Sequence, residues 1–418
     1  FSGEVIIDVS LSKSTQDLWL HGQDLNVSSA SFINADNIKT ALTYKEMGHS
    51  GVANLKAAAP ISPQSGKISI VFSGNLSGDL SGLYLVKDGG LAYAFTQFEP
   101  NYARFAFPSF DEPRFKTPFD ISLEIKQAYK GFANTPQIDE QPTENGYKKI
   151  TFKTTKPLPT YLVAIAVGDL DLVEHAAIPP SDIRNREIPL RGIATKGKGK
   201  DMGYALENTA SILATLEEYF GTPYPYEKLD IVAVPDFAAG AMENAGLITY
   251  REQLLLLGDT PTLDQQRSYA SVHAHELAHQ WFGNLVTMHW WDDIWLNESF
   301  ATWMADISMN KWNPDFGFKR AMVKAGHGVM NSDVFLDTRQ IREPIKSNGD
   351  IESAFDGITY QKGGAVLQML EDYIGEDAFK AGVRYHMKEY AFGNANAMQF
   401  IDSIEKNSDK KNLKLNKE

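Results

Sequence analysis

The sequence of 418 residues is 43% apolar and 22% charged, the composition of an ordinary globular protein, and its length predicts two or three domains. Its 40 basic and 53 acidic residues give a formal net charge of −13, so the basic surface that nucleic-acid-binding proteins carry is not evident. It contains no cysteine, which excludes disulfides, thiolate metal sites and cysteine nucleophiles. Any metal ion must therefore be held by histidine and carboxylate side chains.

Hydropathy and the two ends of the sequence give information on the cellular compartment of the protein. No stretch approaches the roughly 18–20 continuous apolar residues that a membrane-spanning helix needs. Residues 1–7 read as the middle of a β-strand, with neither an initiator methionine nor a signal peptide, and residues 407–412 read as a loop. We therefore expect a longer protein, in which an export signal can precede residue 1. An extracytoplasmic (periplasmic) location is slightly favoured over a cytoplasmic one.

Residues 1–174 have the pattern of a β-rich domain. Short runs in which apolar and polar residues alternate occur at residues 4–9, 67–72 and 120–125. Turn clusters rich in Gly, Ser, Asn and Pro separate such runs. This pattern predicts an all-β, sandwich-like domain of antiparallel strands. A proline-rich stretch at residues 178–182 marks a change in the character of the sequence.

The second domain, assigned to residues 175–418, shows helical periodicity. From about residue 201 apolar residues recur at steps of three and four, which is typical of amphipathic helices. The predicted elements are, in chain order, a helix that stops at Gly221, strands at residues 229–234 and 246–250, and helices at residues 263–282 and 293–309. Strands followed by long helices predict an α+β domain.

The strongest motif is His275-Glu276-Leu277-Ala278-His279, in the first of the two long predicted helices. Positions i and i+4 of a helix share one face, so both imidazoles can bind one metal ion. The carboxylate that directly follows the first histidine can then address a water molecule on that ion. Two surface histidines that bind nothing are the alternative for this motif taken alone.

Catalytic zinc sites have three protein ligands, so a third residue has to complete the histidine pair. A metzincin would place glycine and histidine three and six residues after the second histidine, where this sequence has Phe282 and Leu285. Glu298 stands 19 residues after His279, on the next predicted helix, from which its carboxylate can reach the metal. His275, His279 and Glu298 are therefore the predicted ligands of one zinc ion per chain.

These residues resemble the gluzincin metallopeptidases, and further motifs are similar to those of the aminopeptidase N family. Gly-Ala-Met-Glu-Asn at residues 240–244 resembles the exopeptidase motif of that family. Other similar segments lie at residues 96–100, 107–113 and 359–363. The sequence departs from many members at Ser109 and Ser299, where cysteine and glycine are frequent. Neither position is a predicted ligand.

The resemblance implies a fold and a set of roles. The fold is a saddle-like β domain followed by a thermolysin-like catalytic domain, and in the full-length protein a C-terminal helical domain is expected to cover the site. Glu276 is the implied general base toward a metal-activated water, and Tyr360 is implied to stabilise the tetrahedral intermediate. The implied substrate-binding residues are Gln97, Glu99, Gly240, Ala241, Met242 and Glu243.

Within this set, Glu99 and Glu243 are implied to hold the free α-amino group of a peptide. Gln97, Ala241 and Met242 are implied to line the pocket for the first side chain. The physical chemistry agrees, because an α-amino group with a pKa of about 7.7–8.0 is mostly cationic at neutral pH and binds carboxylates through charge-assisted hydrogen bonds. The predicted partners are peptides with a free N-terminus.

The sequence is also compatible with three other functions. An epoxide hydrolase with aminopeptidase side activity would use the same zinc ligands. A non-catalytic module with a structural zinc would be expected to have a closed site, usually rich in cysteine. A thermolysin-like endopeptidase would not need an anchor for the amino group. Side-chain preference, physiological substrate and oligomeric state are not indicated by the sequence.

Overall fold

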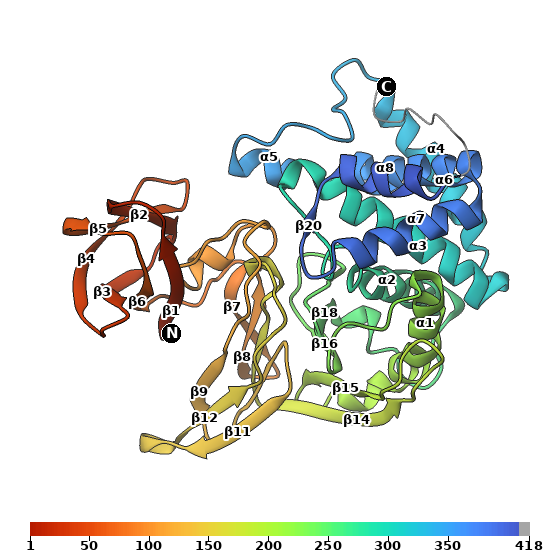
Figure 1. Cartoon of the computed structure of the whole chain (residues 1–418). Coiled ribbons are helices and arrows are strands. Elements are labelled where there is room, and N and C mark those ends of the chain that lie inside the picture. The colour runs from red at the N-terminus through yellow and green to blue at the C-terminus, as the bar shows by residue number, and fades with distance from the viewer. Residues whose placement is uncertain (409–418) are drawn as a thin grey trace.

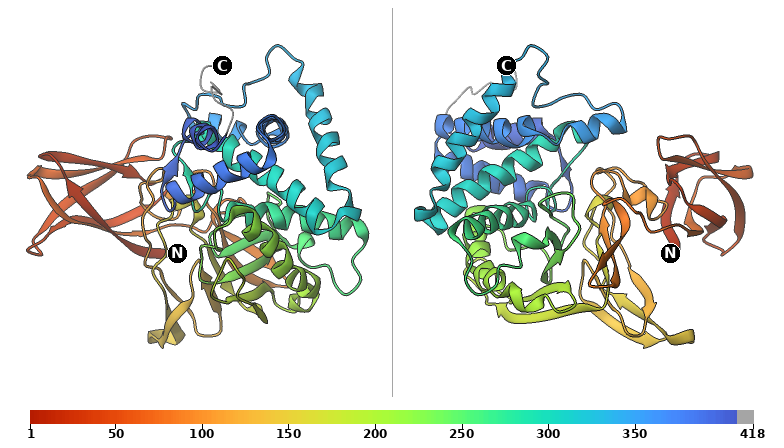
Figure 2. Two further views of the ribbon diagram at one scale, coloured as in Figure 1. Left: turned by 45° about the vertical axis from the view of Figure 1, so that its right-hand side comes forward. Right: turned by 180° about the vertical axis from the view of Figure 1, so that it is seen from behind.

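The computed structural model describes residues 1–408, in which a β-rich N-terminal part lies beside a part where helices pack on a sheet (Figure 1). The predicted order of an all-β part followed by an α+β part is confirmed. In Figure 2 the N-terminal sheets project to one side, while the later helices gather on the other. None of the helices in the described range is long and apolar enough to cross a membrane.

The first sheet is antiparallel and has six strands in the order β1-β6-β3-β4-β5-β2. In β1 every second residue is exposed, because successive side chains of a strand point to opposite faces. Phe32, Ile68 and Ile70 are buried in the core of this sheet. Its strands are β1 (Ser2–Leu11), β2 (Thr15–His21), β3 (Asn26–Asn34), β4 (Lys39–Glu46), β5 (Val52–Ile61) and β6 (Gln64–Ser73).

Two smaller sheets connect this sheet to the second part of the chain (Figure 1). One has the order β10-β13-β8-β7 and the other the order β11-β12-β9. Their strands are β7 (Gly82–Asp88), β8 (Leu91–Gln97), β9 (Ser122–Lys126), β10 (Lys130–Ala133), β11 (Gln137–Pro142), β12 (Tyr147–Phe152) and β13 (Ile165–Gly168). The chain leaves β8 at Gln97, so the segment that contains Glu99 lies where the two parts of the molecule meet.

The second part contains a mixed sheet in the order β14-β15-β16-β18-β17. Strands β15, β16 and β18 are parallel, whereas β14 and β17 run antiparallel at the two edges. The strands are β14 (Leu170–Ile178), β15 (Ile188–Thr195), β16 (Leu229–Val234), β17 (Ala241–Met242) and β18 (Leu247–Arg251). Strand β14 crosses residue 174, the predicted domain boundary, and that boundary stays a prediction.

Most of the other regular elements of the described chain are helices. They are α1 (Gly203–Phe220), α2 (Leu263–His279), α3 (Ile294–Trp312), α4 (Phe318–Asp333), α5 (Asn348–Ser353), α6 (Gly363–Ile374), α7 (Glu376–Glu389) and α8 (Ala397–Lys406). Two short strands, β19 (Thr287–Met288) and β20 (Asn394–Ala395), pair in parallel. The first lies between α2 and α3, and the second lies between α7 and α8. Helix α1 stops at Gly221, as predicted, because that residue adopts a left-handed conformation with φ of 60°.

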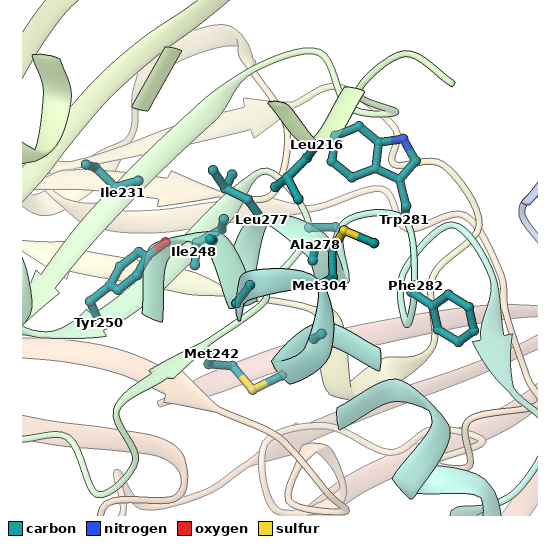
Figure 3. Packing of buried hydrophobic residues seen from close by; sticks show 14 of the residues in the cluster. Leu216, Ile231, Met242, Ile248, Tyr250, Leu277, Ala278, Trp281, Phe282 and Met304 are labelled. Atoms are coloured by element: carbon teal, nitrogen blue, oxygen red, sulfur yellow. The ribbon is translucent and has the colours of Figure 1, made fainter. Parts of the chain in front are cut away.

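Helix α2 is fixed between the sheet and the other helices by its apolar face. Leu277 of α2, and Trp281 just after the helix, pack in one buried cluster with Leu216 of α1 and Ile248 of β18 (Figure 3). The predicted end of this helix, at residue 282, is wrong. The helix ends at His279, and the following turn bends through Gly283, whose φ of 124° an L-residue rarely adopts.

Candidate active site

The three predicted metal ligands come together where α2 packs against α3. The Nε2 atoms of His275 and His279 are 3.0 Å apart, and they lie 3.2 and 3.3 Å from one carboxylate oxygen of Glu298. Two ligands about 2.0–2.1 Å from a tetrahedral zinc ion lie roughly 3.3 Å from each other. The spacing and the chemistry of this donor set therefore fit a zinc ion.

The surroundings of His279 prepare its Nε2 for a metal. Its Nδ1 lies 3.1 Å from the carbonyl oxygen of Phe282 and donates a hydrogen bond to it, which leaves the Nε2 lone pair for coordination. Burial alone would lower the pKa of His279, but the carboxylates of Glu243 and Glu298 outweigh it and raise this pKa to about 10. The site therefore favours positive charge at this point, which a divalent cation supplies.

Glu276 lies beside the metal ligands without belonging to them. Its side chain is buried, and no residue in the described range forms a hydrogen bond to its Oε2 atom. Burial and then the carboxylate of Glu243 raise the pKa of Glu276 well above its usual range. A carboxylate with a raised pKa suits proton transfer near neutral pH, provided that it reaches the reacting water.

A second acidic group adjoins the metal ligands. One carboxylate oxygen from each of Glu99, Glu243 and Glu298 lies within 4.8 Å of the others. Burial and then the charge of Glu243 raise the pKa of Glu99 well above its usual range. Oε1 of Glu99 and Oε1 of Glu243 have no hydrogen-bond partner within residues 1–408. A cationic partner such as an ammonium group would stabilise the charged form of these buried carboxylates.

Polar side chains that follow α2 bind the backbone of Glu243. The amides of Gln280 and Asn284 donate hydrogen bonds of 2.8 and 2.7 Å to the backbone carbonyl of Glu243. Sequence reasoning missed both residues as positioning groups. Both side chains are fully buried in the structure, and no local sequence pattern indicated their contact with Glu243.

Tyr360 lies in a π-helical turn, Ile358–Lys362, and its ring centroid is 6.2 Å from that of His275. Burial and then the nearby carboxylates, Glu298 foremost, raise the pKa of Tyr360 well above its usual range, so the phenol keeps its proton and can donate a hydrogen bond.

The π-helical turn that contains Tyr360 approaches α3 closely at Gly363. A Cβ atom there would lie 1.9 Å from Oγ of Ser299, so this close approach requires glycine.

A cavity of about 330 Å³ connects these groups. It is bordered by all the predicted metal-binding and catalytic residues, and by Gln97, Glu99, Ala241 and Glu243 among the predicted substrate-binding residues. Met242 does not border the cavity: it is buried, and its sulfur accepts a hydrogen bond of 3.3 Å from the Gln97 amide. Gly240 is exposed outside it, and its carbonyl bonds to the Arg251 amide. Substrate-binding roles for these two residues stay predictions.

Further residues at the rim of the cavity were not predicted. Tyr102, Glu352 and Phe355 border the opening, and the Tyr102 hydroxyl donates a hydrogen bond of 2.8 Å to Oε1 of Glu352. These two residues stand 250 positions apart in the sequence, and no local pattern pairs them.

Two family models match this chain. The model of the peptidase M1 N-terminal domain matches residues 1–162, and that of the peptidase family M1 domain matches residues 204–417. Glutamyl aminopeptidase of Mus musculus is 34% identical over 424 residues, which cover 98% of this chain and 44% of that protein. Puromycin-sensitive aminopeptidase of Caenorhabditis elegans is 36% identical over 408 residues, covering 94% of this chain and 42% of that protein.

Aminopeptidase 2 of Candida albicans is 34% identical over 417 residues, with coverage of 97% of this chain and 43% of that protein. The chain thus spans less than half the length of these relatives. The N-terminal family model covers the β-rich part, and the other model covers the part that holds the histidine and glutamate cluster. The relatives cover both parts. The chain belongs to peptidase family M1, the family of the aminopeptidases that its motifs resemble.

Proposed function

We propose that this chain is the N-terminal and catalytic part of a zinc-dependent aminopeptidase that hydrolyses the first peptide bond of peptides. The observation that carries the proposal is that the His275, His279 and Glu298 group and the Glu99, Glu243 and Glu298 group share one carboxylate and one cavity. A metal at the first group and an α-amino group at the second would be held a short, fixed distance apart. Because that distance is fixed, only the first peptide bond of the bound peptide would reach the metal.

One zinc ion per chain, held by His275, His279 and Glu298, would lower the pKa of a coordinated water and polarise the substrate carbonyl. Glu276 takes a proton from the attacking water and passes it to the leaving amine. Tyr360 donates a hydrogen bond to the carbonyl oxygen as negative charge develops there. The resemblance implies these roles, and the burial of the side chains, their positions around the cavity and the unpaired acceptor atoms support the proposal.

We also propose, as the resemblance implies, that a helical domain follows this chain in the full-length protein; the relatives are more than twice as long as the segment that matches. Such a domain would add walls to the cavity. The experiments below therefore use the full-length protein. The relatives carry different names, among them glutamyl and puromycin-sensitive aminopeptidase, so their names do not fix a preferred first residue for this chain.

The proposal is tested with one pentapeptide in three forms: free, N-acetylated and C-terminally amidated. Mass spectrometry of the digest should show that the free peptide loses residues one at a time from its amino end. The acetylated form should react at least 10- to 100-fold more slowly, because it lacks the charge that Glu99 and Glu243 bind. The amidated form is the matched control and should be trimmed like the free acid. Equal rates for the acetylated form, or internal cuts, would point to an endopeptidase.

A further inference from the structure

The cavity contains more negative charge than the proposed reaction uses. Five carboxylates border it, from Glu99, Glu243, Glu276, Glu298 and Glu352, whereas no lysine or arginine within residues 1–408 does. In the proposed function Glu298 binds the metal, Glu276 the water, and Glu99 with Glu243 the α-amino group. Glu352 has no part in that scheme.

A residue that borders the cavity also has an acceptor atom without a partner. Oε1 of Gln97 is buried without a hydrogen-bond partner in the described part of the chain, while the amide nitrogen of the same side chain is engaged by the sulfur of Met242. A buried acceptor of this kind is unfavourable until a ligand provides a donor. A ligand with N–H donors would satisfy the Gln97 oxygen, and one that is also positively charged would suit the Glu352 carboxylate.

Glu352 lies at the opening of the cavity, at the C-terminal end of the short helix α5. The Tyr102 hydroxyl is its one hydrogen-bond donor within residues 1–408, and it occupies Oε1, so Oε2 remains open. The pKa of Glu99 is raised mainly by burial, and Glu352 is among the carboxylates that add to this effect. Glu352 therefore lies within electrostatic reach of the proposed α-amino anchor.

We propose that Glu352 makes this site select peptides whose first side chain is cationic, that of lysine or arginine; this inference rests on the proposed function. The apolar side chains of Leu80 and Phe355 border the same cavity and can accommodate the aliphatic stem, while the charged head reaches a carboxylate. A norleucine side chain has the same stem but leaves the acceptors unpaired. A glutamate side chain adds a like charge to a cavity that already holds five carboxylates.

The test compares kcat/KM for four amides that share one fluorogenic leaving group and carry lysine, arginine, norleucine or glutamate. We expect lysine and arginine to exceed norleucine about tenfold, which corresponds to about 1.4 kcal/mol, and glutamate to fall below norleucine. The lysine-to-norleucine ratio should shrink as the ionic strength rises, because salt screens the charge of a carboxylate at the rim. Norleucine is the control that keeps the four-carbon stem of lysine and lacks its ammonium group.

Variants then assign the preference to one residue. Glu352→Gln should lower the lysine-to-norleucine ratio about tenfold. Tyr102→Phe removes the hydrogen bond but keeps the carboxylate, so the ratio should be retained. Glu389→Gln removes an equal charge from the exposed surface of α7 and serves as the matched control. Zinc content and unfolding temperature are measured for each variant.

Several outcomes would overturn the inference. If the wild-type protein cleaves the norleucine substrate but shows no preference for lysine, the inference fails while the aminopeptidase proposal stands. The same holds if Glu352→Gln lowers both rates equally, or if Tyr102→Phe loses the preference to the same degree. If none of the four substrates is cleaved while the free pentapeptide is trimmed, the inference fails and the aminopeptidase proposal stands; if the pentapeptide is not trimmed either, both proposals fail. The wild-type panel decides the question even if the Glu352 variant does not fold.

Discussion

Replacing Glu276 by Gln is expected to lower kcat by about 10²- to 10⁴-fold, the range that a general acid–base group contributes. The substitution keeps the shape of the side chain and removes its ability to accept a proton. Zinc content should not change, because Glu276 lies outside the cluster formed by His275, His279 and Glu298. Single-turnover kinetics with a free-amino peptide, together with elemental analysis, measure both quantities on the same sample.

The matched control for this variant is Glu207→Gln, an exposed position in helix α1 that lies outside the cavity. Its activity and zinc content should equal those of the wild-type protein. A Glu276→Gln variant that turns over normally would show that another group accepts the proton. A variant that loses zinc would show that Glu276 acts as a ligand.

Replacing Glu298 by Ala is expected to affect the metal itself. The side chain contributes the oxygen that lies 3.2 and 3.3 Å from the two histidine nitrogens, so its loss removes one of three ligands. Zinc affinity should fall by more than the 10- to 100-fold that follows from losing an outer-shell partner, and activity should fall with it. Competition with a chelator of known affinity gives the dissociation constant.

Wild-type protein provides the comparison for this variant. It should retain about one zinc per chain through purification without added metal, lose activity in chelator and regain it when zinc is restored. Full activity in a metal-depleted wild-type sample would contradict the proposed cofactor. Equal loss of zinc in Glu276→Gln and Glu298→Ala would mean that the two glutamates have been given the wrong roles.

Local patterns were sufficient to predict the elements that carry the metal ligands. Strand β16 (Leu229–Val234) has the predicted bounds, and α1 stops at the predicted glycine, because both are specified by neighbouring residues. The helical spacing of His275 and His279 placed both imidazoles on one face, and the structure has them 3.0 Å apart. The end of α2 was predicted wrongly because the apolar residues Trp281 and Phe282 continue the helical pattern, although they are buried after the helix has ended.

The parts of the site that depend on distant contacts were not accessible from local patterns. The pair Tyr102 and Glu352 comes from the two parts of the chain, and nothing in either neighbourhood indicates the other. The amides of Gln280 and Asn284 are recognisable as positioning groups only when the backbone of Glu243 is in place. Periodicity reports which face of an element is buried and does not report what lies opposite that face.

The central claim is that one cavity holds a catalytic metal and the amino end of a peptide side by side. The most direct test is a crystal structure of the full-length Glu276→Gln protein with zinc and a bound peptide that has a free amino end. We predict zinc at His275, His279 and Glu298, and the α-amino group between Glu99 and Glu243. Zinc bound instead by Glu99, Glu243 and Glu298, or a peptide whose amino end points away from both glutamates, would contradict the account.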